Sequence, residues 1–220
     1  MKRILIIEDE ADVVDLLTLN LRRAGQFRIS SATDGVVGLR MAREEFPTLI
    51  VLDLMLPGMC GFEVCRLLRI DEATREIPIV ILSARVDAAD RVRGFEVGAD
   101  DYVTKPFSPR EVVLRIKALA QGENQDVVGG LDWTEDAIAI SGSRHEVTVG
   151  GRRVCLTALE FRLLTHLIRT RGRVQSRDFL LERVWEYVGS MTTRTVDAHI
   201  RRLRKKLGTA GDIIETVHGY

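Results

Sequence analysis

Five short apolar runs alternate with helix-like stretches over the first 120 or so residues of this 220-residue chain. The helix-like stretches have a period near 3.6 residues, as in Val112, Ile116 and Leu119. Strands that alternate with helices favour a parallel sheet with helices on both faces. Five such units in this length are typical of a doubly wound, flavodoxin-like α/β domain with strand order 2-1-3-4-5. The apolar runs are Arg3–Ile7, Arg28–Ser31, Leu49–Asp53, Ile79–Leu82 and Tyr102–Thr104.

The pattern changes after a polar segment at residues 121–126, where residues 122–126 are predicted to be a linker. Residues 127–157 alternate in polarity and contain turn signals, which indicates a small antiparallel sheet. Helical periodicity then predicts helices over 158–171, 176–186 and 193–207. The end, 213–220, resembles a strand entering a turn, so we expect the last strand of a hairpin to be missing from this chain. The predicted domains are therefore residues 1–121 (α/β) and 127–220 (α+β).

Composition narrows the function classes. Residues 1–122 carry 17 basic and 19 acidic residues, and residues 123–220 carry 15 and 13, so a mildly acidic half precedes a mildly basic half. No apolar stretch approaches the length of a membrane span, and none resembles a signal peptide. Three cysteines without CxxC spacing favour free thiols in a reducing compartment. We therefore expect a cytoplasmic protein without a membrane partner.

Polar side chains follow the strands whose ends should meet. In an open parallel sheet, ligands bind at the carboxyl ends of the strands where the strand order reverses, here between the first and third strands. These two strands end in Glu8-Asp9 and in Asp53. The fourth strand ends in Ser83, and Lys105 follows the fifth. The sequence therefore predicts a pocket with at least three carboxylates, one hydroxyl and one ammonium group.

This donor set suits phosphoryl transfer. Oxygen ligands of this kind bind hard divalent cations, above all Mg²⁺. Transfer of a phosphoryl group requires positive charge on its equatorial oxygens, which Mg²⁺ and Lys105 can supply while Ser83 donates a hydrogen bond. Asp53 is then the expected nucleophile, forming an aspartyl phosphate. Each residue alone has an ordinary explanation as a cap or turn residue, but their combination at successive strand ends favours the phosphoryl site.

Residues 2–121 resemble a response-regulator receiver domain, which has a CheY-like fold. The resemblance rests on the segments Ile4–Glu10, Leu52–Gly61, Ile81–Ala84 and Gly98–Phe107. It implies that Asp53 is the phosphoacceptor, that Asp9, Asp53 and the Met55 carbonyl hold Mg²⁺ with Glu8 as the second acid, and that Lys105 binds phosphoryl oxygens. It further implies that Ser83 and Tyr102 form a switch pair and that the peptide bond before Pro106 is cis.

The helix expected at 193–207 has a basic face. Val196, Ile200, Leu203 and Leu207 fall on one stripe. The opposite face carries Arg194, Ala198, Arg201 and Lys205, with Arg202 at its edge. A rigid helix with a core stripe and a cationic face fits the major groove, where arginine reads guanine and other cations contact phosphates. The alternative interpretation is a solvated charged face.

Residues from 127 onward resemble the winged-helix effector domain of the OmpR/PhoB family, on the segments 156–164, 180–185, 194–207 and 215–220. The resemblance implies a helix–turn–helix with a wing, double-stranded promoter DNA as a partner, and a loop at 185–192 that contacts RNA polymerase. DNA contacts are expected from Arg194, His199, Arg201, Arg202, Lys205 and His218. His218 stands where many members have arginine, and a neutral histidine would give a weaker wing contact.

The same resemblance implies a two-fold receiver dimer through the fourth and fifth helices. Intermolecular ion pairs Arg91–Glu111 and Asp101–Arg115 are expected there, and they would set register more than affinity. DNA-binding domains on flexible linkers would then bind repeated half-sites. The face is expected to comprise Arg91, Glu96, Asp100, Asp101, Glu111, Arg115 and Lys117.

We therefore expect a two-component response regulator, phosphorylated by a sensor histidine kinase and activated as a homodimer that binds DNA. We do not expect an enzyme. One alternative is a phosphohydrolase with an aspartate nucleophile, but such enzymes commonly have a second Asp two residues after the nucleophile, where this chain has Met55. Slow self-dephosphorylation is the most turnover that we expect. The other alternative is a dimeric DNA-binding protein that is independent of phosphorylation, which the complete pocket disfavours.

Overall fold

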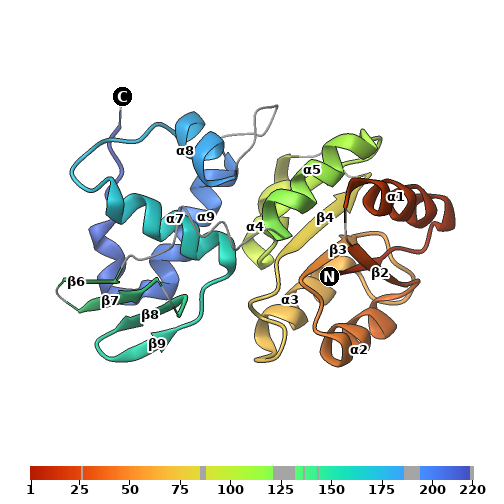
Figure 1. The fold of residues 1–220 in the computed structure, drawn as a ribbon, viewed down its shortest axis with the longest axis horizontal. Coiled ribbons are helices and arrows are strands. Elements are labelled where there is room, and N and C mark those ends of the chain that lie inside the picture. Colours follow the sequence, from red (N-terminus) through yellow and green to blue (C-terminus); the bar gives the residue numbers. More distant parts are fainter. Residues whose placement is uncertain are drawn as a thin grey trace. The chain divides into compact units, whose positions relative to one another are not determined.

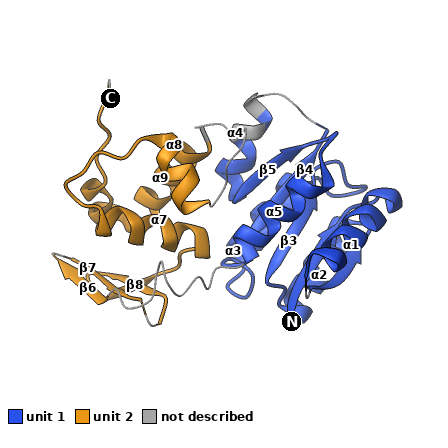
Figure 2. Cartoon of the chain, turned by 45° about the horizontal axis from the view of Figure 1, so that its top comes forward, with its two compact units in different colours: residues 1–120 blue, residues 121–220 orange. Residues whose placement is uncertain are grey.

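The computed structural model divides the chain into two compact units, residues 1–120 and 121–220 (Figure 2). It describes residues 1–25, 27–84, 88–120, 132–135, 137–142, 144–185 and 194–218, without the side chains of 88, 89, 91, 92 and 194. The predicted linker at 122–126 lies outside these residues. Among the helices described, none is both long enough and apolar enough to cross a bilayer.

The first unit is a five-stranded parallel sheet in the order β2-β1-β3-β4-β5, as predicted. Helices α1 and α5 contact each other on one face, and α2, α3 and α4 follow one another on the other (Figure 1). All five residues of β3 and of β4 are buried, which explains their continuous apolar character. The strands are β1 (Lys2–Ile7), β2 (Phe27–Ala32), β3 (Leu49–Asp53), β4 (Ile79–Ser83) and β5 (Asp101–Thr104). The helices are α1 (Ala11–Ala24), α2 (Gly35–Glu45), α3 (Gly61–Ile70), α4 (Ala88–Val97) and α5 (Pro109–Ala120).

A close approach of backbone fixes the end of β3. A Cβ atom on Gly61, the first residue of α3, would lie 2.1 Å from the carbonyl oxygen of Asp53, so only glycine fits there. The Gly61 amide also donates to the carbonyl of Leu54 at 3.1 Å. The start of α3 is thereby held against the end of β3, which positions Asp53 at the edge of the sheet.

The second unit begins with a four-stranded antiparallel sheet in the order β6-β7-β8-β9. Ile138, Ile140 and Val147 turn inward from this sheet and are buried, as the alternating pattern predicts. The strands are β6 (Asp132–Glu135), β7 (Ile138–Ser141), β8 (Glu146–Val149) and β9 (Arg152–Val154). Helices α7 (Ala158–Arg169), α8 (Arg177–Val184) and α9 (Arg194–Leu207) follow, and then a 3₁₀ helix, η1 (Gly208–Ile213).

One prediction about this unit is wrong within the described residues. Residues 214–218, expected to begin a hairpin strand, form no strand. A strand requires hydrogen bonds to a neighbouring strand, and no described segment pairs with these residues. Arg204 instead holds them to α9, because its guanidinium donates to the Ile214 carbonyl and to Thr216 Oγ1.

Candidate functional site: a phosphoryl pocket and a cationic helix

The strand order brings the predicted pocket together. Asp53 ends β3 and is 2% exposed, Glu8 follows the neighbouring strand β1, and Lys105 follows β5. Lys105 Nζ lies 2.9 Å from Asp53 Oδ2, 2.9 Å from Glu8 Oε2 and 2.8 Å from Glu10 Oε1. One ammonium group therefore faces three carboxylates at the carboxyl edge of the sheet.

Charge perturbs the acid–base properties of this cluster. Burial by itself lowers the pKa of Lys105, but hydrogen bonds to Asp53, Glu10 and Glu8 outweigh it and raise the pKa. Burial raises the pKa of Glu8 to about 7, with the Asp53 charge adding to the effect and Lys105 opposing it. The pocket thus holds more negative charge than Lys105 alone neutralises. Glu8 is the carboxyl group whose pKa is raised.

The cluster also differs from the expected ligand set. Oxygens of Glu8, Glu10 and Asp53 lie within 4.8 Å of one another, whereas Asp9 is exposed and is not part of this group. Asp53 Oδ1 accepts a hydrogen bond from the Met55 amide at 3.1 Å. Glu8 Oε2 is buried and accepts no hydrogen bond from the described residues, although Lys105 Nζ is near. Carboxylate oxygens with spare acceptor capacity are suitable ligands for Mg²⁺, so the residues present fit this ion.

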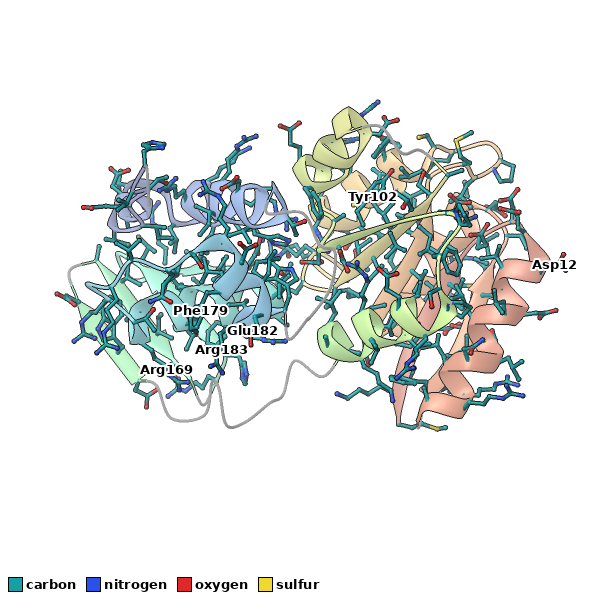
Figure 3. All side chains as sticks on the ribbon, turned by 90° about the horizontal axis from the view of Figure 1, so that it is seen from above. Asp12, Tyr102, Arg169, Phe179, Glu182 and Arg183 are labelled. Carbon is teal, nitrogen blue, oxygen red and sulfur yellow. The ribbon has the colours of Figure 1, made fainter. Side chains whose placement is uncertain are left out.

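The expected switch residues lie on neighbouring strands. Ser83 ends β4 and is fully buried, and Tyr102 on β5 is 6% exposed. Figure 3 labels Tyr102 in this unit. A Cβ atom on Gly94 of α4 would lie 3.0 Å from the Tyr102 ring, so the ring packs against α4 without a side chain between them. The ring is therefore turned inward in this structure.

The residues expected on the dimer face differ in exposure. Glu96 is exposed, and Glu111 and Lys117 are half-buried. Asp100, however, is fully buried: its carboxylate accepts from Arg69 at 2.7 Å and from the Ile79 amide at 2.9 Å. Asp100 therefore does not belong to the surface expected there, because its charge requires these internal donors. The side chain of Arg91 lies outside the described residues.

The two residues expected to pair between chains contact each other within this single chain. Arg115 Nη1 lies 3.0 and 2.8 Å from the two carboxylate oxygens of Asp101 in the same chain. Arg115 Nη2 also contacts Glu111 Oε1 at 2.7 Å, one helical turn away. Asp101 and Arg115 are both buried, and burial makes an internal partner necessary for each charge. In the single chain, Asp101 and Arg115 are thus partners of each other.

The basic helix α9 divides its cations between two environments. Arg201 and Lys205 are exposed, one helical turn apart. Arg202 is half-buried: its Nη2 lies 2.7 Å from His199 Nδ1, and its Nε lies 3.7 Å from Glu160 Oε1. His199, expected to contact DNA, is fully buried, with its ring edge-on to Trp185. The structure contradicts this expectation, because the ring packs in the interior beside Trp185 and does not face solvent.

Three other expectations for the DNA site concern the ends of its elements. His218 is exposed, as a wing contact requires. The side chain of Arg194 and loop residues 186–192 lie outside the described residues. Glu10 and Glu160 are not among the site residues that the sequence predicts. The pattern Thr157-x-x-Glu160 before an apolar run could have drawn attention to Glu160.

Known proteins show the same combination of parts. One family model, the response regulator receiver domain, matches residues 4–117, and a second, the C-terminal domain of transcriptional regulatory proteins, matches residues 151–220. The chain is 43% identical over 206 residues to the DNA-binding response regulator MtrA of Mycobacterium tuberculosis, covering 94% of this chain and 88% of that protein. It is 42% identical over 230 residues to the transcriptional regulatory protein CseB of Streptomyces coelicolor, covering 99% and 95%.

Solved structures agree with these likenesses. The chain is similar to a mutant of RitR with a TM-score of 0.74 and 30% identity, covering 100% of this chain and 96% of that one. It is also similar to response regulator DrrB of Thermotoga maritima, described as an OmpR/PhoB homologue, with a TM-score of 0.53 and 30% identity. Both likenesses extend over the receiver and the DNA-binding unit.

Proposed function

Because this chain belongs to the response regulators that join a receiver domain to an OmpR/PhoB-type DNA-binding domain, we propose that phosphorylation of Asp53 controls its binding to promoter DNA. Members of this family are DNA-binding regulators of two-component systems and receive their signal from sensor kinases. One observation carries the proposal: Lys105 Nζ lies 2.9 Å from the Asp53 carboxylate, beside two further acids, at the edge of the sheet.

The proposed transfer uses the residues of this pocket. An oxygen of Asp53 attacks the phosphorus of a phosphohistidine on the sensor kinase, the P–N bond breaks, and the leaving imidazole keeps the electron pair. Lys105 donates to the phosphoryl oxygens and stabilises their charge. Ser83 would donate to the same group once its hydroxyl turns toward it, and the inward ring of Tyr102 would keep the space beside Ser83 closed to bulk water.

A divalent cation completes the pocket. Bound Mg²⁺ would offset the repulsion between the carboxylates and the incoming phosphoryl group. Glu8 and Asp53 are the buried ligands proposed for it, Asp9 and the Met55 carbonyl remain proposed ligands, and Glu10 is added because of its place in the cluster.

Asp53→Asn tests the phosphoacceptor directly. The wild-type protein, incubated with acetyl phosphate and Mg²⁺, should gain an acyl phosphate that is labile to acid and alkali and is cleaved by hydroxylamine, and the Asn variant should gain none. Asp12→Asn is the matched control: it removes an acid from the first turn of α1, which Figure 3 shows at the outer side of this unit, and should leave incorporation unchanged. Equal labelling of Asp53→Asn and wild type would rule out Asp53 as the acceptor.

The phosphate should persist once formed. Residue 55 is Met, which offers no acid–base group to assist the attack of water on the phosphoryl group, and it is 55% exposed. Self-dephosphorylation is therefore proposed to be slow. The phosphohydrolase alternative is disfavoured for the same reason, and a DNA-binding protein independent of phosphorylation is disfavoured by the complete pocket.

The active form is proposed to be a homodimer that binds repeated half-sites in promoter DNA in the cytoplasm and contacts RNA polymerase through the loop at 185–192. The dimer face is proposed to include Arg91, Glu96, Glu111, Lys117 and, after rearrangement, Asp101 and Arg115. The DNA contacts are proposed to come from Arg194, Arg201 and Lys205 on α9, with His218 adding a weak wing contact. Arg202 remains at the edge of this surface.

Arg201→Ala tests the DNA surface. If Arg201 contacts DNA, the variant should bind a duplex selected by the wild-type protein more weakly. The slope of log binding constant against log salt concentration should also become shallower by about 0.9, the value for one phosphate contact. An unaltered footprint and slope would contradict the assignment of α9 as the recognition helix.

A further inference from the structure

A fully buried carboxylate connects two helices of the DNA-binding unit. Glu160, on the first turn of α7, is 0% exposed. Its Oε2 accepts from the Thr157 amide at 2.9 Å, and the Glu160 amide donates back to Thr157 Oγ1 at 3.3 Å. This reciprocal capping box holds the carboxylate in one rotamer at the start of α7. The charge of Glu160 is thus fixed in space by the backbone of its own helix.

The partners of this carboxylate come from α9. Lys206 Nζ donates to Glu160 Oε2 at 2.5 Å, and Arg202 Nε lies 3.7 Å from Glu160 Oε1. Lys206 and Arg202 are one helical turn apart on the flank of α9 that faces α7. A buried carboxylate needs cationic partners because its desolvation is costly. Both cations are therefore held toward α7.

The remaining described cations of α9 have other positions. Arg204 is bound to the segment after η1 through the Ile214 carbonyl and Thr216 Oγ1. Arg201 and Lys205 are exposed. The described cations of α9 thus fall into two groups: Lys206, Arg202 and Arg204 bind other parts of this unit, and Arg201 and Lys205 are exposed. A rotation of α9 about its axis would break the contacts of Lys206 and Arg202 with Glu160 on one flank and those of Arg204 with Ile214 and Thr216 on the other.

We propose that Glu160 is a positioning residue for DNA recognition: by holding Lys206 and Arg202 against α7, it sets the rotation of α9 that presents Arg201 and Lys205 to DNA. This inference rests on the proposed role of α9 in DNA binding. Base readout requires arginine geometry fixed to a fraction of an ångström, whereas attraction to phosphates tolerates displacement. Loss of the Glu160 charge should therefore impair discrimination between sequences more than affinity for any DNA.

Glu160→Gln in the full-length chain tests this. Glutamine can also occupy the third position of a capping box, so the start of α7 is retained. The variant is compared with wild type on two probes: a duplex selected by the wild-type protein from a randomised pool, and a duplex of random sequence. Discrimination between them should fall about tenfold, the low end of one lost base contact. The released Lys206 and Arg202 can reach phosphates, so the salt dependence on both probes should steepen by about 0.9 or more.

Glu182→Gln is the matched control. Glu182 is an exposed acid on α8, labelled in Figure 3, and its substitution makes the same change in net charge. Discrimination and salt slope in Glu160→Gln that equal those of Glu182→Gln would overturn the proposal, because net charge alone would then explain the effects. A purely structural role for Glu160 would weaken binding without steepening the slope, and that outcome also overturns it.

Lys206→Met keeps the test decisive if Glu160→Gln does not fold. This variant removes the nearer of the two α9 partners of Glu160 without freeing a cation. It should therefore lose discrimination with no steeper salt dependence. Wild-type discrimination in Lys206→Met would overturn the inference. Failure of the proposed function would give a different result, because Arg201→Ala and Lys205→Ala would then leave the salt slope unchanged. In that case α9 would not contact DNA, and the proposed role of Glu160 would also be wrong.

Discussion

Lys105 contacts three carboxylates, and two of these, Glu8 and Asp53, are buried. A buried carboxylate is costly without a cation nearby, so Lys105 has one role in the unphosphorylated pocket and a second in phosphoryl transfer. It stabilises the resting pocket, and it supplies the positive charge that an incoming phosphoryl group needs. The raised pKa of Lys105 keeps it charged throughout the physiological range.

Lys105→Met should slow phosphorylation strongly. Loss of one preorganised cationic donor to developing phosphoryl charge commonly lowers the rate by roughly 10²-fold. The initial rate of incorporation from acetyl phosphate measures this. Arg43→Met, which removes a cation bound to Asp71 elsewhere in the unit, is the control and should retain the wild-type rate. A rate within twofold of wild type in Lys105→Met would contradict the proposed role.

His166 gives the DNA-binding unit a pH dependence. Burial lowers the pKa of its imidazole, and the nearby charge of Arg183 adds to this, followed by that of Arg169. The two arginines and Phe179, whose ring centroid is 6.1 Å from that of His166, are labelled in Figure 3. With a folded pKa below the unfolded value near 6.5, the unfolded state binds the proton more readily, so stability falls as pH decreases below about 6.5.

Denaturant unfolding followed by tryptophan fluorescence checks this, because both tryptophans, Trp133 and Trp185, lie in this unit. The midpoint should decrease between pH 7 and pH 5.5, and His166→Gln should show a smaller decrease. An equal decrease in both proteins would assign the effect to other groups.

At the scale of elements, the two ion pairs that Arg115 of α5 forms, one with Asp101 on β5 and one with Glu111 on α5 itself, have unequal energies. Asp101 and Arg115 form a buried pair in which Arg115 Nη1 donates to both carboxylate oxygens, whereas Glu111 is 32% exposed and joins Arg115 from the same helix. Breaking a buried pair leaves one charge without its partner, but breaking a partly exposed pair leaves a charge that water can reach. We therefore expect the pair with Asp101 to hold β5 against α5.

Asp101→Asn should destabilise the receiver unit by about 3 kcal/mol, the low end for a broken buried pair because Arg115 retains Glu111. Glu111→Gln should cost less than about 1 kcal/mol. Urea unfolding followed by circular dichroism measures both, and tryptophan fluorescence identifies the transition of the other unit. Equal effects of the two substitutions would mean that burial does not set the strength of this pair.

The capping box of α7 belongs to the same scale. Thr157→Ala removes the hydroxyl that accepts a hydrogen bond from the Glu160 amide. The substitution should destabilise the DNA-binding unit by about 1 kcal/mol. Ser176→Ala at the exposed start of α8 is the matched cap substitution. A smaller loss is expected there, because water can satisfy the amide that is released. Tryptophan-detected unfolding would contradict this if the order were reversed.

At the scale of the whole molecule, phosphorylation must act by favouring one state over another. In this structure Arg115 is bound to Asp101 and Glu111 within one chain. The proposed dimer would therefore require some of these pairs to exchange partners.

Glu96→Lys should weaken the proposed dimer, because it replaces an exposed acid on α4 by a cation beside other cations of this face. Sedimentation of the full chain with acetyl phosphate and Mg²⁺ should show a dimer for wild type and a lower dimer fraction for the variant. Glu44→Lys on α2, outside this face, is the control. An unchanged dimer fraction in Glu96→Lys would place the interface elsewhere.

Local patterns determined much of this molecule. Apolar runs and helical periodicity predicted the five strands, their order and the three helices of the DNA-binding unit. The pocket followed from that order, because residues at the carboxyl ends of neighbouring parallel strands must lie close together. Asp53, Glu8 and Lys105 could therefore be brought together from sequence alone.

Tertiary structure decided which neighbour each charged side chain meets. Glu10 and not Asp9 joins the cluster, because successive side chains at the start of a helix point in different directions. His199 is buried and Arg202 lies beside Glu160, because α7 and α8 cover that flank of α9. Periodicity defines the faces of a helix, but only the packed structure shows which residues from distant segments cover them.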